Sequence, residues 1–325
     1  MKTKVRILSV LLLSALVLPS ALFARGRADT GELSVYVIGG PSGVGMIRMF
    51  ERPPEVPGHK VGMKVLAGND LLAASFLSGE AKIGILAPNV AASIHASGRD
   101  LRVLAVIGNG MLSLLTSDPE LRNVAGLRGR TVQVAGQGAT PDFVFRRILA
   151  SRGLTPDRDV RLDFSLAYPE IALSLIAGRI DTALLPEPFA TMARNGNPGI
   201  RQVADVRAEW ELAGGQGNFP MTLLVADGAF ADANPEAVAA ILDAVRDSIE
   251  WVTANPAEAG LLVQKHNLGL TSEVAAAAIP RSNYVFVPAA EARPSIEALF
   301  RIFMEYSPDS IGGGLPSDRF YGQKD

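Results

Sequence analysis

The sequence has 325 residues, of which 48% are hydrophobic and 20% are charged, and its formal net charge is −2 at pH 7. This composition is typical of a globular protein with a large core, and the interspersed charges argue against a nucleic-acid-binding surface, where Lys and Arg would cluster. The chain contains no cysteine, which excludes disulfides, thiolate metal sites and a cysteine nucleophile.

The first 24 residues have the pattern of a cleavable secretory signal peptide. Lys2, Lys4 and Arg6 precede a mostly apolar run that ends at Phe23, and small residues follow. Ser and Pro inside the run make an uncleaved membrane anchor the weaker alternative. Cleavage after residue 24 would leave 301 residues (325 minus 24) and remove three positive charges, which takes the net charge to about −5. Without a cysteine to carry a lipid, we expect a free periplasmic protein.

Strands and helices then alternate along the chain. The expected strands are Leu33–Ile38, Val61–Leu66, Lys82–Leu86, Leu101–Ile107, Thr131–Ala135, Arg161–Phe164, Ile180–Leu185 and Ile200–Val206. The expected helices between them include Ser42–Phe50, Asn69–Leu77, Asn89–Ala96 and one that begins at Thr140. Strands that alternate with helices of this length predict βαβ units and a mainly parallel sheet.

Two stretches about one hundred residues apart are nearly the same. LAASFLSGEAKIGILAP (residues 72–88) resembles IALSLIAGRIDTALLPE (residues 171–187), and the glycine-rich turn at residues 39–43 is echoed at residues 136–141. This spacing is too long for a solenoid repeat of about 20–50 residues. It predicts two similar α/β lobes, with a ligand cleft where loops leave the carboxyl ends of their strands.

The lobes are expected to be unequal, because the first is discontinuous. The apolar run 111–116 leads to the break Ser117-Asp-Pro119, which reads as the first crossover between lobes, and the β-prone run 220–226 reads as the return. From Asn234 onward the pattern is helical, with the tail after Ser307 irregular, and these helices would pack on the first lobe. The predicted division is a first lobe of residues 30–116 plus 226–325 and a second lobe of residues 117–225.

Candidate binding residues follow the strand ends. The helices after Gly39-Gly-Pro-Ser42 and Gly136-Gln-Gly-Ala-Thr140 would each point free N–H groups at a ligand. A single glycine turn can occur at any junction between a strand and a helix. The prediction of a binding site therefore rests on the occurrence of two such turns at matching places in the two lobes. Neither turn is a dinucleotide or Walker fingerprint.

Glu187 stands between two prolines after a buried strand, where it could accept hydrogen bonds from an amine or hydroxyl of a ligand, or be an exposed turn carboxylate. The three histidines are scattered and predict no metal site, and His95 is expected at the surface. Tyr36, Tyr168 and Tyr284 are candidates to line the cleft or to pack in the core.

These residues resemble a known family. The match rests on Gly40-Pro-Ser-Gly43, Leu77-Ser-Gly-Glu80, Ala135-Gly-Gln-Gly-Ala-Thr-Pro-Asp142, Gly178-Arg-Ile-Asp181 and Leu185-Pro-Glu-Pro-Phe189. Over the whole mature chain, the sequence is similar to the periplasmic substrate-binding proteins of ABC importers for nitrate, sulfonates, taurine and thiamine precursors. The resemblance implies an α/β, type II periplasmic-binding fold, whose two lobes close on a small molecule and dock on an ABC permease at the inner membrane.

The resemblance and the strand ends together give the predicted ligand-binding residues. They are Gly40, Pro41, Ser42, Asn89, Asn109, Gln137, Gly138, Ala139, Thr140, Glu187 and Phe219. We expect a monomer without a cofactor. Because the sequence has no obvious cleft arginine, an amine-bearing or neutral heterocyclic ligand suits Glu187 better than an oxyanion. Two other functions stay open: a sensory ligand-binding domain, and an enzyme of the thiamine-pyrimidine or menaquinone pathway on the same fold.

Overall fold

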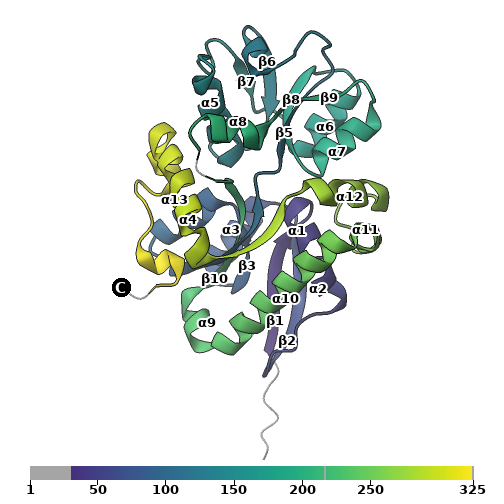
Figure 1. The fold of residues 1–325 in the computed structure, drawn as a ribbon. Helices are drawn as coiled ribbons and strands as arrows, with labels where there is room; N and C mark the ends of the chain where they lie inside the picture. The colour runs from purple at the N-terminus through teal and green to yellow at the C-terminus, as the bar shows by residue number, and fades with distance from the viewer. Residues whose placement is uncertain (1–30, 216, 324–325) are drawn as a thin grey trace, which may run out of the picture.

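The computed structural model describes residues 31–215 and 217–323. They form two lobes, each built on its own β-sheet, and the chain passes between the lobes twice (Figure 1). The predicted signal peptide lies outside the described residues. Within the described ranges, no helix is long and apolar enough to cross a membrane.

The first lobe contains a six-stranded sheet in the order β11-β4-β10-β3-β1-β2. Its strands are β1 (Gly31–Ile38), β2 (His59–Leu66), β3 (Ile83–Leu86), β4 (Leu101–Asn109), β10 (Pro220–Asp227) and β11 (Tyr284–Pro288). Its helices are α1 (Pro41–Gly45), α2 (Arg48–Glu51), α3 (Asn69–Ser78), α4 (Pro88–Ala96), α9 (Gly228–Ala233), α10 (Pro235–Ala254), α11 (Pro256–Lys265), α12 (Ser272–Ala278) and α13 (Ala289–Tyr306). β1 runs parallel to β2 and β3, whereas β10 is antiparallel to β3 and β4.

The second lobe contains a five-stranded sheet in the order β7-β6-β8-β5-β9. Its strands are β5 (Leu112–Thr116), β6 (Thr131–Val134), β7 (Arg161–Asp163), β8 (Thr182–Pro186) and β9 (Arg201–Asp205). Its helices are α5 (Thr140–Ser151), α6 (Tyr168–Ile176), α7 (Phe189–Gly196) and α8 (Val206–Leu212). β6 runs parallel to β7 and β8, and β5 is antiparallel to β8 and β9.

The repeat seen in the sequence is a helix–strand unit that occurs once in each lobe. One copy is α3 followed by β3, and the other is α6 followed by β8. Gly79 and Gly178 lie just beyond the two helices with φ angles of 80° and 66°, the left-handed region that favours glycine. β3 and β8 are buried along their whole length, as their unbroken apolar runs predict.

The strand pairing differs from the expected division at both crossovers. β5 pairs with the second sheet, although residues 112–116 were expected in the first lobe. β10 pairs with β3 and β4 of the first sheet, although most of it was expected in the second lobe. By sheet membership, residues 31–109 and 220–323 belong to the first lobe and residues 112–212 to the second. An apolar run indicates burial, but it does not indicate which sheet a strand joins.

Two further expectations fail at short elements. The chain after Asn234 is not purely helical, because β11 pairs antiparallel with β4. The single helix expected at residues 42–50 is instead two short ones, α1 and α2. Gly43 and Gly45 lie inside α1, and glycine is destabilising within a helix by about 1 kcal/mol, which explains why this helix does not continue.

The two lobes touch along one side through α5 and α13. The ring of Phe143 stacks on Tyr306 at a centroid distance of 5.7 Å and meets Phe303 edge-on at 4.8 Å. Arg147 Nη1 donates to Glu305 Oε2 at 3.2 Å in the same region. The largest apolar core cluster includes residues of both lobes, so the lobes share a packed boundary.

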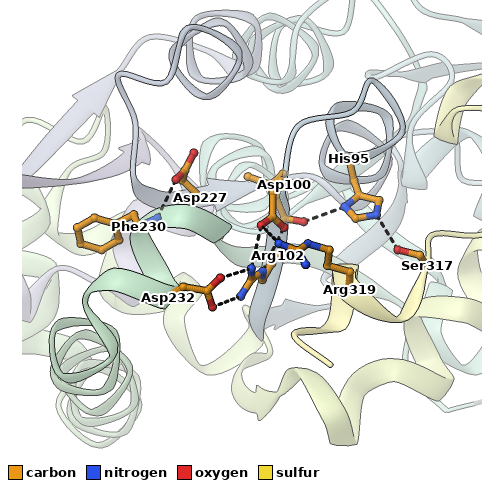
Figure 2. A network of polar contacts seen from close by, with 9 residues as sticks. His95, Asp100, Arg102, Asp227, Phe230, Asp232, Ser317 and Arg319 are labelled. Carbon is orange, nitrogen blue, oxygen red and sulfur yellow. Dashed lines mark hydrogen bonds and ion pairs between the residues drawn. The ribbon is translucent and has the colours of Figure 1, made fainter. Parts of the chain in front are cut away.

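The tail after Ser307, expected to be irregular, contains two short 3-10 helices, Pro308–Ile311 and Asp318–Tyr321, and it packs on the first lobe (Figure 2). Phe320 is fully buried, and Arg319 donates to Asp100, which also pairs with Arg102. His95, expected at the surface, is half-buried: its ring contacts the Leu101 carbonyl and the Ser317 hydroxyl. The tail therefore closes over α4 and the start of β4.

Candidate functional site

The turn after β1 approaches the start of α7 in the other lobe. Gly40 follows β1 with a φ of 96°, which glycine alone adopts readily. A Cβ atom placed on Gly40 would lie 3.8 Å from the ring of Phe189, the first residue of α7 in the other lobe. The carboxyl ends of β1 and β8 therefore lie close to each other across the boundary between the lobes.

An aromatic pair continues this contact into the second lobe. Phe189 stacks on Tyr168 with 5.8 Å between centroids and an interplanar angle of 17°. A Cβ atom on Gly136, in the turn after β6, would lie 3.8 Å from the Tyr168 hydroxyl. Burial raises the pKa of Tyr168, so the phenol stays neutral and can donate a hydrogen bond.

Two predicted residues, one from each lobe, carry buried oxygen atoms without a partner. Asn89 Oδ1, in the first turn of α4, and Thr140 Oγ1, at the start of α5, are inaccessible to solvent and have no hydrogen-bond partner among the described residues. Leaving a buried polar group unsatisfied costs about 1–3 kcal/mol. Trp210 Nε1 and the Tyr321 hydroxyl are also buried without a partner in the described part of the chain, and each such atom calls for an explanation. Asn89 and Thr140 are the two that stand at predicted binding positions.

The structure explains why the Thr140 hydroxyl is unpartnered. Thr140 was expected to cap α5, but Ala139 occupies the cap position. Asp142 Oδ2 instead accepts the hydrogen bond of the Gly138 N–H at 2.9 Å. The Gly138 N–H is thus committed within the turn, whereas the hydroxyl of Thr140 stays available. Gln137, beside it, is exposed.

Glu187 forms its hydrogen bonds with residues of the second lobe, to which it belongs. It is only 2% exposed, which rules out the interpretation as an exposed turn carboxylate. Its Oε2 accepts from the Thr191 N–H at 2.9 Å, and its Oε1 accepts from Arg194 Nη2 at 2.7 Å. Both oxygens already have donors, so the expectation of an amine-bearing ligand loses its main support. Arg194, two helical turns beyond Glu187, is an interlobe arginine that we did not expect from the sequence.

Two weaker candidates have other roles in the structure. The Asn109 N–H donates to the Asn283 carbonyl, at the end of β4. Phe219 is 1% exposed and packs edge-on against Trp210 at 5.6 Å. The contacts of both residues are those of the interlobe connections and the core.

A cavity of about 410 Å³ lies next to this region, where β4 passes into β5. Glu187 and Arg194 line it, together with Gly110, Met111, Leu112, Ser113, Gln202, Asp205, Arg207, Pro280, Arg281 and Asn283. The lining comes from both lobes and is mostly polar. In the part of the chain that the structure describes, no group of three or more His, Cys, Asp or Glu side chains could hold a metal ion.

Comparison with known proteins gives two matches in sequence. Residues 59–265 match the model of the NMT1-like family. The nitrate/nitrite binding protein NrtA of Synechococcus elongatus is 29% identical over 140 residues. That alignment covers 41% of this chain and 30% of the relative, so the chain spans less than a third of that protein's length.

Solved structures match over almost the whole described chain. A crystal structure described as an ABC transporter, from Parabacteroides distasonis, has a TM-score of 0.77 and 26% identity, covering 91% of this chain and all of that one. The periplasmic aliphatic sulphonate binding protein SsuA of Escherichia coli has a TM-score of 0.69 and 16% identity, covering 88% and 92%. The nitrate-binding protein NrtA of Synechocystis has a TM-score of 0.62 and 14% identity, covering 87% and 84%. The predicted two-lobed fold of periplasmic binding proteins is thereby confirmed.

Proposed function

The chain belongs to the NMT1-like family, and we propose that it is an extracytoplasmic solute-binding protein of an ABC importer. It captures a small molecule between its lobes and delivers it to the permease subunits at the inner membrane. It acts as a monomer in the periplasm, exported by the signal peptide of residues 1–24 and without a lipid anchor. It performs no catalysis.

The observation that carries this proposal is the pair of unpartnered oxygens, Asn89 Oδ1 in one lobe and Thr140 Oγ1 in the other. A ligand that satisfies both atoms touches both lobes. It binds the closed arrangement better than an open one, and this difference in affinity drives closure. The close approach of Gly40 to Phe189 supports a contact between the lobes at these strand ends.

The same atoms restrict the ligand. An amide oxygen accepts a hydrogen bond, and a threonine hydroxyl donates or accepts one. The ligand therefore carries at least one N–H or O–H group for Asn89. The stacked rings of Phe189 and Tyr168, close to Gly40 of the first lobe, offer an apolar surface for such a ligand. We propose a small polar molecule with a flat or apolar part, such as a heterocycle.

The test is thermal unfolding of the mature protein with a panel of sulfonates, taurine, nitrate, thiamine precursors, purines and other heterocycles. A ligand at one hundred times its Kd stabilises the fold by about 2.7 kcal/mol, which raises the Tm measurably. We expect one chemical class to do so. If every compound leaves the Tm unchanged, the importer role for these solute classes is contradicted.

A further inference from the structure

The cavity beside β5 holds more positive charge than its own carboxylates neutralise. Three arginines, Arg194, Arg207 and Arg281, and two carboxylates, Glu187 and Asp205, line it. Three positive charges against two negative charges leave an excess of one. A polar cavity of about 410 Å³ is within the size range of small-molecule sites.

Both carboxylates already accept hydrogen bonds from other groups of the protein. Glu187 is held by the Thr191 N–H and by Arg194. Asp205 Oδ1 caps α8, where it accepts from the N–H groups of Arg207 and Ala208 at 2.9 and 3.4 Å. Neither carboxylate forms an ion pair with the side chain of Arg207 or Arg281.

Two guanidinium groups therefore remain for a ligand. Among the described residues, nothing forms a hydrogen bond or ion pair with the side chain of Arg207. Arg281 Nη1 donates to the Ala277 carbonyl at 2.8 Å and pairs with no described carboxylate. Arg207 belongs to α8 of the second lobe, and Arg281 follows α12 of the first lobe. The cavity thus brings an unneutralised arginine from each lobe to one space.

The same cavity lies beside the segment that joins β4 to β5, which is one of the two connections between the lobes. Gly110 joins β4 to β5 and lines the wall. Its carbonyl accepts from Asn283 Nδ2 at 3.1 Å, and its N–H donates to Asn218 Oδ1 at 3.1 Å. Asn283 has a φ of 47°, in the left-handed region, and it lies two residues after Arg281. A group bound to Arg281 is therefore held directly beside both interlobe connections.

We propose that this cavity is a second binding site, which takes a small oxyanion such as sulfate, phosphate or a carboxylate through Arg207 and Arg281. The planar guanidinium fork matches the paired oxygens of such anions. An anion that bridges the two arginines links the lobes and stabilises their present arrangement. Neither Asn89 nor Thr140 lines this cavity, so the proposed anion site is additional to the proposed solute site.

The experiment is calorimetric titration of the mature protein with sodium sulfate and, separately, sodium phosphate, with sodium chloride at matched ionic strength as the reference. We expect saturable binding with one site for each chain. The double variant Arg207→Gln/Arg281→Gln should weaken binding at least tenfold. Both side chains are exposed, so the variant should fold. Arg122→Gln removes the same charge from an exposed position outside the cavity and should bind as the wild type does.

Three results would overturn the proposal. One is equal binding by the double variant and the wild type, which would mean an adventitious ion only. Another is loss of sulfate binding in Thr140→Val but not in the double variant, which would place the anion at the solute site. The third is the absence of saturable binding. Because the panel contains oxyanions, it is repeated with the double variant, which lacks the second site. A Tm rise that persists in that variant reports solute capture alone, so the two proposals fail independently.

Discussion

At the scale of single residues, the side chains that matter most are those that the chain leaves unsatisfied. Asn89 and Thr140 keep buried oxygens without partners, whereas Glu187 has donors on both carboxylate oxygens. A buried charge with its own partners stabilises a lobe, but it has less to offer a ligand. The unpartnered neutral atoms are therefore the better candidates for solute recognition.

Replacing Thr140 with valine separates binding from stability. Valine has nearly the same shape without the hydroxyl, so the free energy of unfolding should stay the same or rise slightly, because an unsatisfied buried group is removed. The affinity for the solute should fall about tenfold, or about 1.4 kcal/mol, measured by calorimetry with the compound that the panel identifies. Thr131→Val, at an exposed strand start, is the matched control. An unchanged Kd in Thr140→Val would remove this residue from the site.

The sequence predicted these residues but not their roles. Gly40 and Thr140 were found because a glycine turn at a strand end is a local pattern. The partner of Glu187 was not found, because nothing in the run Pro186-Glu-Pro188 indicates that Arg194 folds back on it. Hydrogen bonds between a turn and the second turn of the next helix depend on rotamers, which the pattern of residue types does not fix.

At the scale of elements, the prediction worked where the pattern was long or repeated. The buried strands β3 and β8 were found from their unbroken apolar runs. β11 was missed because Tyr284–Pro288 is a short strand between two helices. The crossovers were expected at residues 117–119 and 220–226, whereas the chain crosses between β4 and β5 and between α8 and β10. Both errors arise because sheet membership depends on pairing between residues distant in sequence.

The attachment of the tail after Ser307 to the first lobe can be tested by replacing Asp100. Its carboxylate accepts from Arg102 Nη2 at 2.8 Å and from Arg319 Nη2 at 2.7 Å, and these hydrogen bonds hold the pKa of Asp100 well below its usual range. Asp100→Asn should destabilise the protein at pH 7 by about 1 kcal/mol, a figure reduced for solvent screening, measured by denaturant unfolding.

The stability that is lost in Asp100→Asn should depend on pH in one direction. Because the pKa of Asp100 is lowered in the folded state, its stabilising effect is fully present above the unfolded-state value of about 3.9 and disappears as the pH falls below it. The difference between wild type and Asp100→Asn should therefore shrink as the solution is acidified from pH 5 toward pH 3. Asp247→Asn, at an exposed position without a described ion pair, should behave as the wild type at each pH. A difference that is constant with pH would contradict the account.

At the scale of the whole molecule, the lobes meet at several places, which include the packing of α12 on α7. Phe143 and Tyr306 stack on one side, Gly40 and Phe189 approach at the strand ends, and the cavity at Gly110 lies beside the crossovers. Asn89 in the first lobe and Thr140 in the second each carry a buried oxygen without a described partner. Under the proposed function, a solute bound to both atoms holds the lobes together, and opening of the lobes releases it.

The most direct measurement is the distance between the lobes with and without solute. The chain has no cysteine, so spin labels attach only where cysteine is introduced, and Leu71 on α3 and Leu173 on α6 are 55% and 53% exposed. In the Leu71→Cys/Leu173→Cys protein, electron–electron double resonance should give a broad distance distribution without solute. A saturating concentration of the solute found in the panel should narrow that distribution to a single shorter distance. A distribution that stays the same when the solute is bound would contradict capture by closure of the two lobes.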